Sequence, residues 1–347
     1  MSDELGRVFP TAARSIAAAG WVESAANVTE GAVPKTPPCV ALAAQCLPDA
    51  ETVAARSISL WARNAADWLI ARLVGNSGPW RLHVFCIPAT EGSATPARCE
   101  YIRQCIADML RKKQRRLVRM WNHDPQSPLG ADDWLLQIGL RTATTGYFSA
   151  LAPDDRARLR RMVSRFPGGV VAVPPDRRAP SRAFAKLAEV ELRLGRPIMP
   201  GETCVDLGSS PGSWAWWALK RGAQVVAVDR SPLRSDLMRS AALSFVHGDA
   251  FRYRPTRPVG WLLCDVIAFP AKTISLIERW LDEGWCRWFC VTIKFRGEQE
   301  YDRLEGLKTR FASSGYDFYL RRLTANKNEV MLFGRRLATD GDLRGGL

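Results

Sequence analysis

Four aspartates each stand at the end of a short apolar run in the second half of the chain. The runs are TCVD, QVVAVD, LSFVHGD and GWLLCD, and they end at Asp206, Asp229, Asp249 and Asp265. A single aspartate at such a place is usually a turn or cap residue. Because the carboxyl ends of parallel strands meet at one edge of a sheet, four in succession indicate a ligand site.

The first two runs are separated by a turn and a helical segment. The turn contains Gly208 and Gly212, and a helix is expected from about Ser213. Glycine has no Cβ, so the backbone of this turn lets a ligand approach closely. A strand, a glycine turn, a helix and a second strand ending in an acid are typical of a nucleotide pocket. Asp229 is then placed to accept hydrogen bonds from a ribose diol.

Two cofactors compete for this pocket. A dinucleotide site has the pattern G-x-G-x-x-G, but here Ser210 replaces the middle glycine and Pro211 stiffens the turn. No Walker lysine follows, which excludes a P-loop. Asp249 is in position for an adenine amine, and carboxylates suit a cationic sulfonium, so S-adenosylmethionine fits better. The residues predicted to bind it are Asp206, Gly208, Ser209, Ser210, Pro211, Gly212, Ser213, Trp214, Asp229, Asp249 and Asp265.

Composition indicates a cytoplasmic protein of about two domains. The chain has 347 residues and is 47% hydrophobic, with no run long enough to span a membrane and no signal-peptide core. Its nine cysteines form no CxxC pair, and its three histidines do not cluster with them. The sequence therefore predicts reduced thiols and no metal site.

A net charge of +14 favours a polyanionic partner. One basic run, 111–119, falls at the end of a predicted helix, 99–117, and a second lies within 153–182. The first also suits a solvated helix end that complements the dipole, but the number of charges favours RNA. The predicted RNA contacts are Arg111, Lys112, Lys113, Arg115, Arg116, Arg177, Arg178 and Arg182.

The periodicity of apolar residues predicts two folded domains. A helix at 57–73, a strand at 80–87, the helix at 99–117 and a strand at 134–140 form a small α+β domain over 56–152. Residues 1–55 carry no confident motif, and 153–180 are expected to be a basic linker. An α/β domain covers 181–337, with Ser181 as the N-cap of its first helix and a closing hairpin of 317–323 and 329–334. A loose tail, 338–347, follows.

Several separated motifs resemble the FtsJ-type ribose 2′-O-methyltransferases. They are SRAFAKL, DLGSSPGSW, the LLCDV and PAK segments, DEGWCRWFCVTIK and NKNEV, within about 180–336. The similarity is greatest to the RlmM branch, which methylates a cytidine ribose of bacterial large-subunit rRNA. It implies a Rossmann-like, mostly parallel seven-stranded sheet with a C-terminal antiparallel hairpin. More weakly, 56–152 resembles a THUMP domain, an RNA-binding module.

The resemblance also implies a Lys-Asp-Lys-Glu tetrad at Lys186, Asp265, Lys294 and Glu329. A ribose 2′-hydroxyl must lose its proton while it attacks the methyl carbon in line. Lys294 is either the base or a charged group that positions the alkoxide, because the carboxylates favour its charged form and Lys186 its neutral form. A set of surface ion pairs is the alternative, although lysine is unusual at the end of the apolar strand VTIK.

Together these features predict an S-adenosylmethionine-dependent RNA 2′-O-methyltransferase. The expected substrate is 23S rRNA or a pre-ribosomal particle, and the oligomeric state stays open. The family usually has glycine where Ser209 or Ser213 stands here, and FRGEQEY is less basic than its family counterpart. These departures leave two alternatives, a tRNA or mRNA 2′-O-methyltransferase and a non-catalytic RNA-binding or assembly factor.

Overall fold

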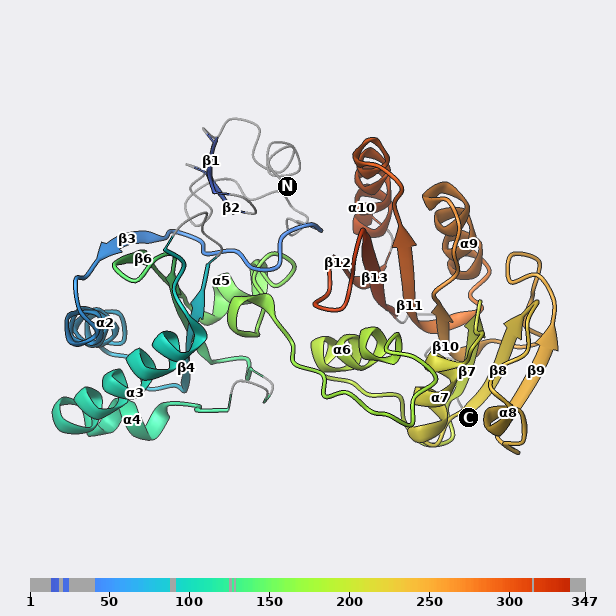
Figure 1. The fold of residues 1–347 in the computed structure, drawn as a ribbon, viewed down its shortest axis with the longest axis horizontal. Coiled ribbons are helices and arrows are strands. Elements are labelled where there is room, and N and C mark those ends of the chain that lie inside the picture. Colours follow the sequence, from blue (N-terminus) through green and yellow to red (C-terminus); the bar gives the residue numbers. More distant parts are fainter. Residues whose placement is uncertain are drawn as a thin grey trace. The chain divides into compact units, whose positions relative to one another are not determined.

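The chain divides into two compact units, Met1–Val170 and Val171–Leu347 (Figure 1). The computed structural model describes residues 14–18, 21–24, 41–87, 92–124, 127, 129–313 and 315–337. The predicted tail, 338–347, lies outside the described residues, as does most of 1–40. Within 1–40, β1 (Arg14–Ala18) pairs antiparallel with β2 (Trp21–Ser24). None of the described helices is long and apolar enough to cross a membrane.

The first unit is built on a four-stranded sheet with the order β3-β6-β5-β4. Its strands are β3 (Glu51–Ala54), β4 (Trp80–Cys86), β5 (Trp134–Leu140) and β6 (Thr145–Leu151). Helices α2 (Ile58–Arg72) and α3 (Pro96–Lys113) pack on it, with Trp61, Leu69 and Ile102 fully buried. The mixed α+β character expected here is therefore present.

The first unit differs from the sequence prediction in three respects. Strands β3 and β6 were not predicted, and the helix expected at 99–117 is broken at Gln114, whose φ of −146° is not helical, before the short α4 (Arg115–Met120). The linker was expected to contain one short helix, and α5 (Pro153–Arg158) matches that expectation, but the residues after it do not behave as a linker. Residues following α5, Leu159 and Met162, are buried against Leu135 of β5, so this part of 153–180 is packed in the first unit.

The second unit contains a seven-stranded sheet with the order β12-β13-β11-β10-β7-β8-β9. The strands are β7 (Thr203–Leu207), β8 (Gln224–Asp229), β9 (Leu243–His247), β10 (Val259–Cys264), β11 (Cys286–Lys294), β12 (Tyr316–Arg321) and β13 (Glu329–Arg336). Strands β7 to β11 are parallel, and β13 is antiparallel to both β11 and β12. The predicted mostly parallel sheet with a C-terminal hairpin is confirmed.

Helices cover this sheet and connect its parallel strands (Figure 1). They are α6 (Phe184–Leu194), α7 (Ser213–Lys220), α8 (Ser235–Met238), α9 (Pro270–Asp282), the 3-10 turn η2 (Glu298–Asp302) and α10 (Arg303–Ser313). The chain runs outward through β7, β8 and β9 and then returns to the other side of β7 as β10. This reversal of strand order opens a crevice at the carboxyl ends of β7 and β10, the usual ligand site of such sheets.

The predicted N-cap of the first helix was wrong. The cap of α6 is Ala183, which makes no side-chain cap bond. Ser181 lies two residues earlier, where its Oγ accepts a hydrogen bond from Ala183 N and lies 2.7 Å from Ser213 Oγ. Ser181 therefore ties the start of α6 to the start of α7, beside the glycine turn.

Candidate active site

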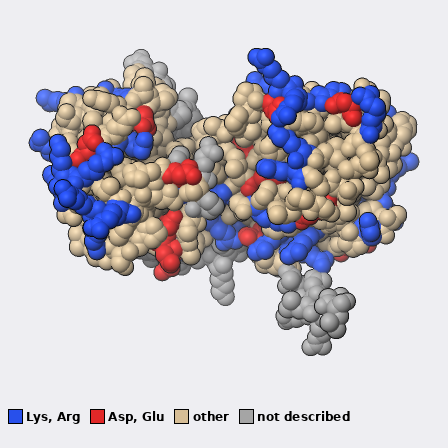
Figure 2. All heavy atoms as spheres, turned by 90° about the horizontal axis from the view of Figure 1, so that it is seen from below, with Lys and Arg blue, Asp and Glu red and all other residues tan. Residues whose placement is uncertain are grey.

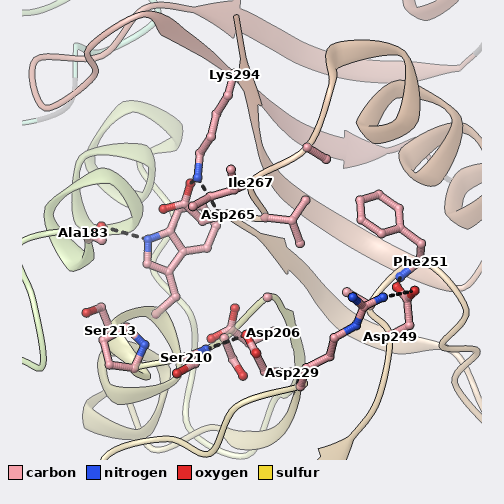
Figure 3. A pocket seen from close by; sticks show the side chains of 18 of the residues that line it. Ala183, Asp206, Ser210, Ser213, Asp229, Asp249, Phe251, Asp265, Ile267 and Lys294 are labelled. Atoms are coloured by element: carbon pink, nitrogen blue, oxygen red, sulfur yellow. Dashed lines mark hydrogen bonds and ion pairs between the residues drawn. The ribbon is translucent and has the colours of Figure 1, made fainter. Parts of the chain in front are cut away.

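A cavity of about 640 Å³ lies at the carboxyl edge of the second unit's sheet. Its walls are the turn after β7 and the loops that follow β8, β9 and β10, with Lys294 at the end of β11 (Figure 3). Such a volume is within the usual range for small-molecule sites. The sequence placed the acids at the ends of these strands, and all four aspartates line the cavity.

The turn after β7 brings backbone close to the wall of the cavity. Gly208 has a φ of +73°, and a Cβ built on it would lie 2.5 Å from Val266 Cγ1. Only glycine meets both conditions without strain. Gly212, with a φ of +108°, caps α7 but is not among the lining residues. The Ser210–Pro211 peptide bond is cis.

Asp206 lies at the buried bottom of the cavity. Its side chain is almost fully buried and accepts a hydrogen bond of 2.9 Å from Ala215 N in α7. Burial is the main cause that raises the pKa of Asp206 to about 8; the hydrogen bond from Ala215 acts against it, and the negative charges of Asp265 and Asp229 act in the same direction as burial. The carboxyl is therefore poised to change its proton occupancy when a cation enters the cavity.

Asp229 and Asp249 fix the loops at the other end of the cavity. Asp229 accepts hydrogen bonds from Ser210 N at 3.0 Å and Ser231 N at 2.9 Å. Asp249 accepts from Phe251 N at 2.9 Å and pairs with Arg230 at 2.6 Å. The Phe251 N–H is the main cause that lowers the pKa of Asp249, so this carboxylate is ionised. Each acid still has free lone pairs for the ribose or adenine contacts predicted from the sequence.

The turn also holds one unsatisfied hydroxyl. Ser209 is buried, and its Oγ has no hydrogen-bond partner among the described residues. Ser209 is among the residues that line the cavity, but the oxygen itself is buried in the described structure. Trp214 also lines the cavity, but it is 2% exposed and donates its indole N–H to Ala183 O at 2.8 Å. That bond gives Trp214 a packing role between α6 and α7.

The structure brings the four residues of the predicted tetrad together. Lys186 Nζ lies 2.7 Å from Glu329 Oε1 and 3.2 Å from Asp265 Oδ2. Lys294 Nζ lies 3.0 Å from Asp265 Oδ1 and donates to the carbonyl oxygen of Asp265 at 2.7 Å (Figure 3). Asp265 therefore bridges the two lysines.

Four different elements supply the tetrad. Lys186 is on α6, Asp265 follows β10, Lys294 ends β11 and Glu329 begins β13, where it is the register partner of Lys294. The side chains of Lys186 and Glu329 are 11% and 10% exposed. These values distinguish the tetrad from a set of surface ion pairs. Asp265 and Lys294 line the cavity, whereas Lys186 and Glu329 do not.

Basic side chains predicted to contact RNA lie on both units. In the first unit, Lys and Arg gather around the end of α3 and on α4, and all of those predicted there are exposed (Figure 2). Arg111 pairs with Asp108 and Lys113 with Asp67. In the second unit Arg177, Arg178 and Arg182 are exposed, and Arg178 pairs with Asp176.

The sequence analysis missed several residues at the cavity. They are Arg230, Ile267, Phe269, Lys272, Arg296 and Phe251. Ile267 and Phe269 lie two and four residues after Asp265, and their solvent exposure of 91% and 54% is unusual for large apolar side chains. The signal available in the sequence was the segment IAF, an apolar run placed between a strand-end acid and the proline that starts α9.

Comparison with known proteins is consistent with this site. Residues 179–283 match the FtsJ-like methyltransferase family. Three relatives are each named ribosomal RNA large subunit methyltransferase M. The one from Thauera aminoaromatica is 31% identical over 210 residues, 57% of this chain and 56% of the relative. Those from Azotobacter vinelandii and Laribacter hongkongensis are 34% and 35% identical over 197 and 191 residues, with 54% and 52% of this chain and 51% and 54% of the relatives.

The chain spans about half the length of the curated relatives it matches. The matched family segment contains the cavity turn and two members of the tetrad, Lys186 and Asp265. The resemblance to FtsJ-type methyltransferases and their RlmM branch, inferred from separated motifs, is confirmed. The THUMP-like character of 56–152 stays a prediction.

Proposed function

We propose that this protein is an S-adenosylmethionine-dependent RNA ribose 2′-O-methyltransferase that acts on 23S rRNA, free or in a pre-ribosomal particle. The observation that carries the proposal is the enclosed tetrad of Lys186, Asp265, Lys294 and Glu329 at the wall of a cavity with nucleoside-binding features. The relatives' names support the large ribosomal subunit as the source of the substrate. Free thiols at the described cysteines support a cytoplasmic location.

The cavity fits S-adenosylmethionine. Gly208 allows close approach, and Asp229 lies at the end of β8, where such sheets bind a ribose. The carboxylate of Asp265 complements a cationic ligand electrostatically, and the buried Asp206 loses its proton more readily when a cation is bound. Bound there, the cofactor would supply an electrophilic methyl group.

Lys294 is the residue of the tetrad placed to act on the acceptor hydroxyl. Its amine lines the cavity and is held from two sides by the carboxylate and the backbone carbonyl of Asp265. In either role, as base or as charged positioner, the amine lies beside the 2′-oxygen, and Asp265 fixes its direction. Lys186 and Glu329 hold Asp265 and the start of β13 in place.

RNA would be attracted by the positive charge of the chain. The net charge of +14 and the exposed basic residues of α3 and α4 supply phosphate contacts that do not depend on sequence.

Methyl transfer from tritiated S-adenosylmethionine to a 23S rRNA transcript tests the proposal. Lys294→Ala should abolish transfer and leave the calorimetric affinity for the cofactor intact, while Lys220→Ala, on the exposed end of α7, should behave like wild type. Lys294→Arg separates the two roles, because arginine keeps its charge and does not act as a base. Residual transfer by Lys294→Arg identifies a positioner.

Three outcomes would overturn parts of the proposal. Transfer to tRNA or mRNA but not to 23S rRNA would establish an alternative substrate. Binding of NAD with no binding of S-adenosylmethionine would exclude the cofactor. RNA binding without transfer to any RNA would make the protein an RNA-binding or assembly factor.

A further inference from the structure

The loop between Asp265 and α9 holds two large apolar side chains out toward solvent. Ile267 is 91% exposed and Phe269 is 54% exposed, whereas Val266 between them and Asp265 is buried. Val266 packs against Gly208, where no Cβ intervenes. Val266 therefore anchors the loop. The backbone held in this way directs the side chains of Ile267 and Phe269 toward solvent.

Both side chains lie at the tetrad end of the cavity. Ile267, Phe269, Asp265 and Lys294 line the same cavity, and Figure 3 shows Ile267 beside the amine of Lys294 and the carboxylate of Asp265. A substrate that brings a hydroxyl to Lys294 must therefore pass these apolar side chains.

A cation completes this surface. The guanidinium carbon of Arg296, two residues beyond Lys294, lies 4.1 Å from the centre of the Phe269 ring. The Arg296 side chain is exposed and forms no ion pair with a carboxylate among the side chains that the structure describes, while its backbone N–H donates to Glu300 Oε2 at 2.7 Å. Arginine planes and aromatic rings are the groups on which unpaired bases stack, and a guanidinium also binds phosphate.

The surface formed by Ile267, Phe269 and Arg296 thus offers an apolar face and a positive charge next to the amine that acts on the acceptor. A nucleotide has the matching parts in one unit: a flat base, a sugar hydroxyl and a phosphate. In a duplex the faces of a base are covered by its neighbours, so this contact requires an unpaired base. An apolar segment of a protein partner would match Ile267 and Phe269 but leave Arg296 unused.

We propose that Ile267, Phe269 and Arg296 form a stacking platform for an unpaired base within one nucleotide of the ribose that is methylated. The platform selects single-stranded or opened RNA and sets the position of the 2′-hydroxyl at Lys294. This inference rests on the proposed function.

The first test is kinetic and uses the full chain with a 23S rRNA transcript. Ile267→Ser with Phe269→Ala should lower kcat/KM for the RNA about 10- to 100-fold, the range for the loss of one stacked base. The dissociation constant of S-adenosylmethionine should stay within twofold of wild type. Met199→Ser is the matched control, because Met199 is 47% exposed and precedes β7 at the opposite edge of the sheet.

The second test couples the protein change to a change in the RNA. Once the position methylated by the wild type has been mapped, short RNAs carry an abasic site at that nucleotide or at either neighbour. At one of these positions, the abasic site should lower kcat/KM of the wild type about 10-fold or more. The same abasic site should lower kcat/KM of the double variant little further, because that protein has already lost the stacking contact.

The outcomes separate the platform from the proposed function. If the wild type methylates no RNA, the proposed function fails. If the wild type is active and the double variant matches it, the platform is refuted. A double variant that loses cofactor affinity without RNA would show that the loop covers the cofactor. Equal losses with all three abasic RNAs in both proteins would show that no base is bound there.

Discussion

The ion pair between Lys186 and Glu329 offers the sharpest test of the tetrad's structure. The two atoms that form it are 2.7 Å apart, and Lys186 Nζ has two further contacts of 3.2 Å to the carboxylate oxygens of Asp265. Lys186→Met keeps the length of the side chain and removes the charge. Asp265 then still has Lys294, but Glu329 keeps only the hydrogen bond of 2.9 Å from Asn326 among the contacts that the structure describes.

The expected cost follows from burial. Breaking a buried ion pair by removing one partner costs about 3–5 kcal/mol, and the slight exposure of both side chains places this case near the lower limit, at about 3 kcal/mol. Glu329→Gln should cost about 1.5 kcal/mol, because Lys186 keeps Asp265 as its partner. The double variant should cost no more than Lys186→Met, which leaves a coupling of about 1.5 kcal/mol.

Hydrogen exchange measured by mass spectrometry reports this coupling locally. Peptides from α6 and β13 should lose protection in Lys186→Met, while peptides from α2 in the first unit serve as the internal control. Exposed pairs couple by about 0.2–1 kcal/mol. A measured coupling below about 0.5 kcal/mol would therefore mean that the tetrad behaves as a set of surface ion pairs.

Three further predictions concern the cavity and the basic residues. Burial raises the pKa of Asp206 to about 8, so the folded chain binds a proton that the unfolded chain has lost above about pH 4, and stability falls with a slope of at most about 1.4 kcal/mol per pH unit up to pH 8. Asp206→Asn should lack this slope. If the melting temperatures of the two proteins changed with pH in parallel from pH 5 to 8, the raised pKa of Asp206 would be contradicted. Gly208→Ala should destabilise the chain by about 1–3 kcal/mol, because its φ is +73° and Val266 occupies the space of the new methyl group, while Gly248→Ala, with open space, should not lower the melting temperature. Arg115→Ala with Arg116→Ala should reduce the slope of log affinity against log salt by about 1.4, the value for two phosphate contacts on a single strand, and an unchanged slope relative to Arg63→Ala would mean that this helix face does not contact RNA.

The sequence was most informative about the strands of the second unit, because several of them end in the same residue type, aspartate. Apolar runs that end in aspartate located β7, β8 and β10 closely, and parallel pairing then places Asp206, Asp229 and Asp265 at one edge. Strands that are covered on both faces consist almost entirely of apolar residues. A polar residue after such a run therefore marks the point where the strand leaves the core.

The failures have tertiary causes. Strand β6, TGYFSAL, mixes small and polar residues and is held mainly by its neighbours β5 and β3. Ser181 satisfies the sequence rule for an N-cap, but its hydroxyl is used by Ser213 on α7. The outward direction of Ile267 depends on Val266 filling the space above Gly208, a contact between separate loops that no local pattern shows.

The position of Glu329 follows from the antiparallel direction of β13, which distinguishes this sheet from a purely parallel one. Parallel strands present their carboxyl ends at the cavity edge, which is why Asp265 follows β10 and Lys294 ends β11. Strand β13 runs antiparallel to β11, so its amino end lies at that same edge, and Glu329, its first residue, is paired in register with Lys294. A carboxylate that must meet Lys186 there has to begin the last strand. The reversal of β13 therefore explains why the sequence signal for this residue is an acid before an apolar run, whereas for the other acids it is an acid after one.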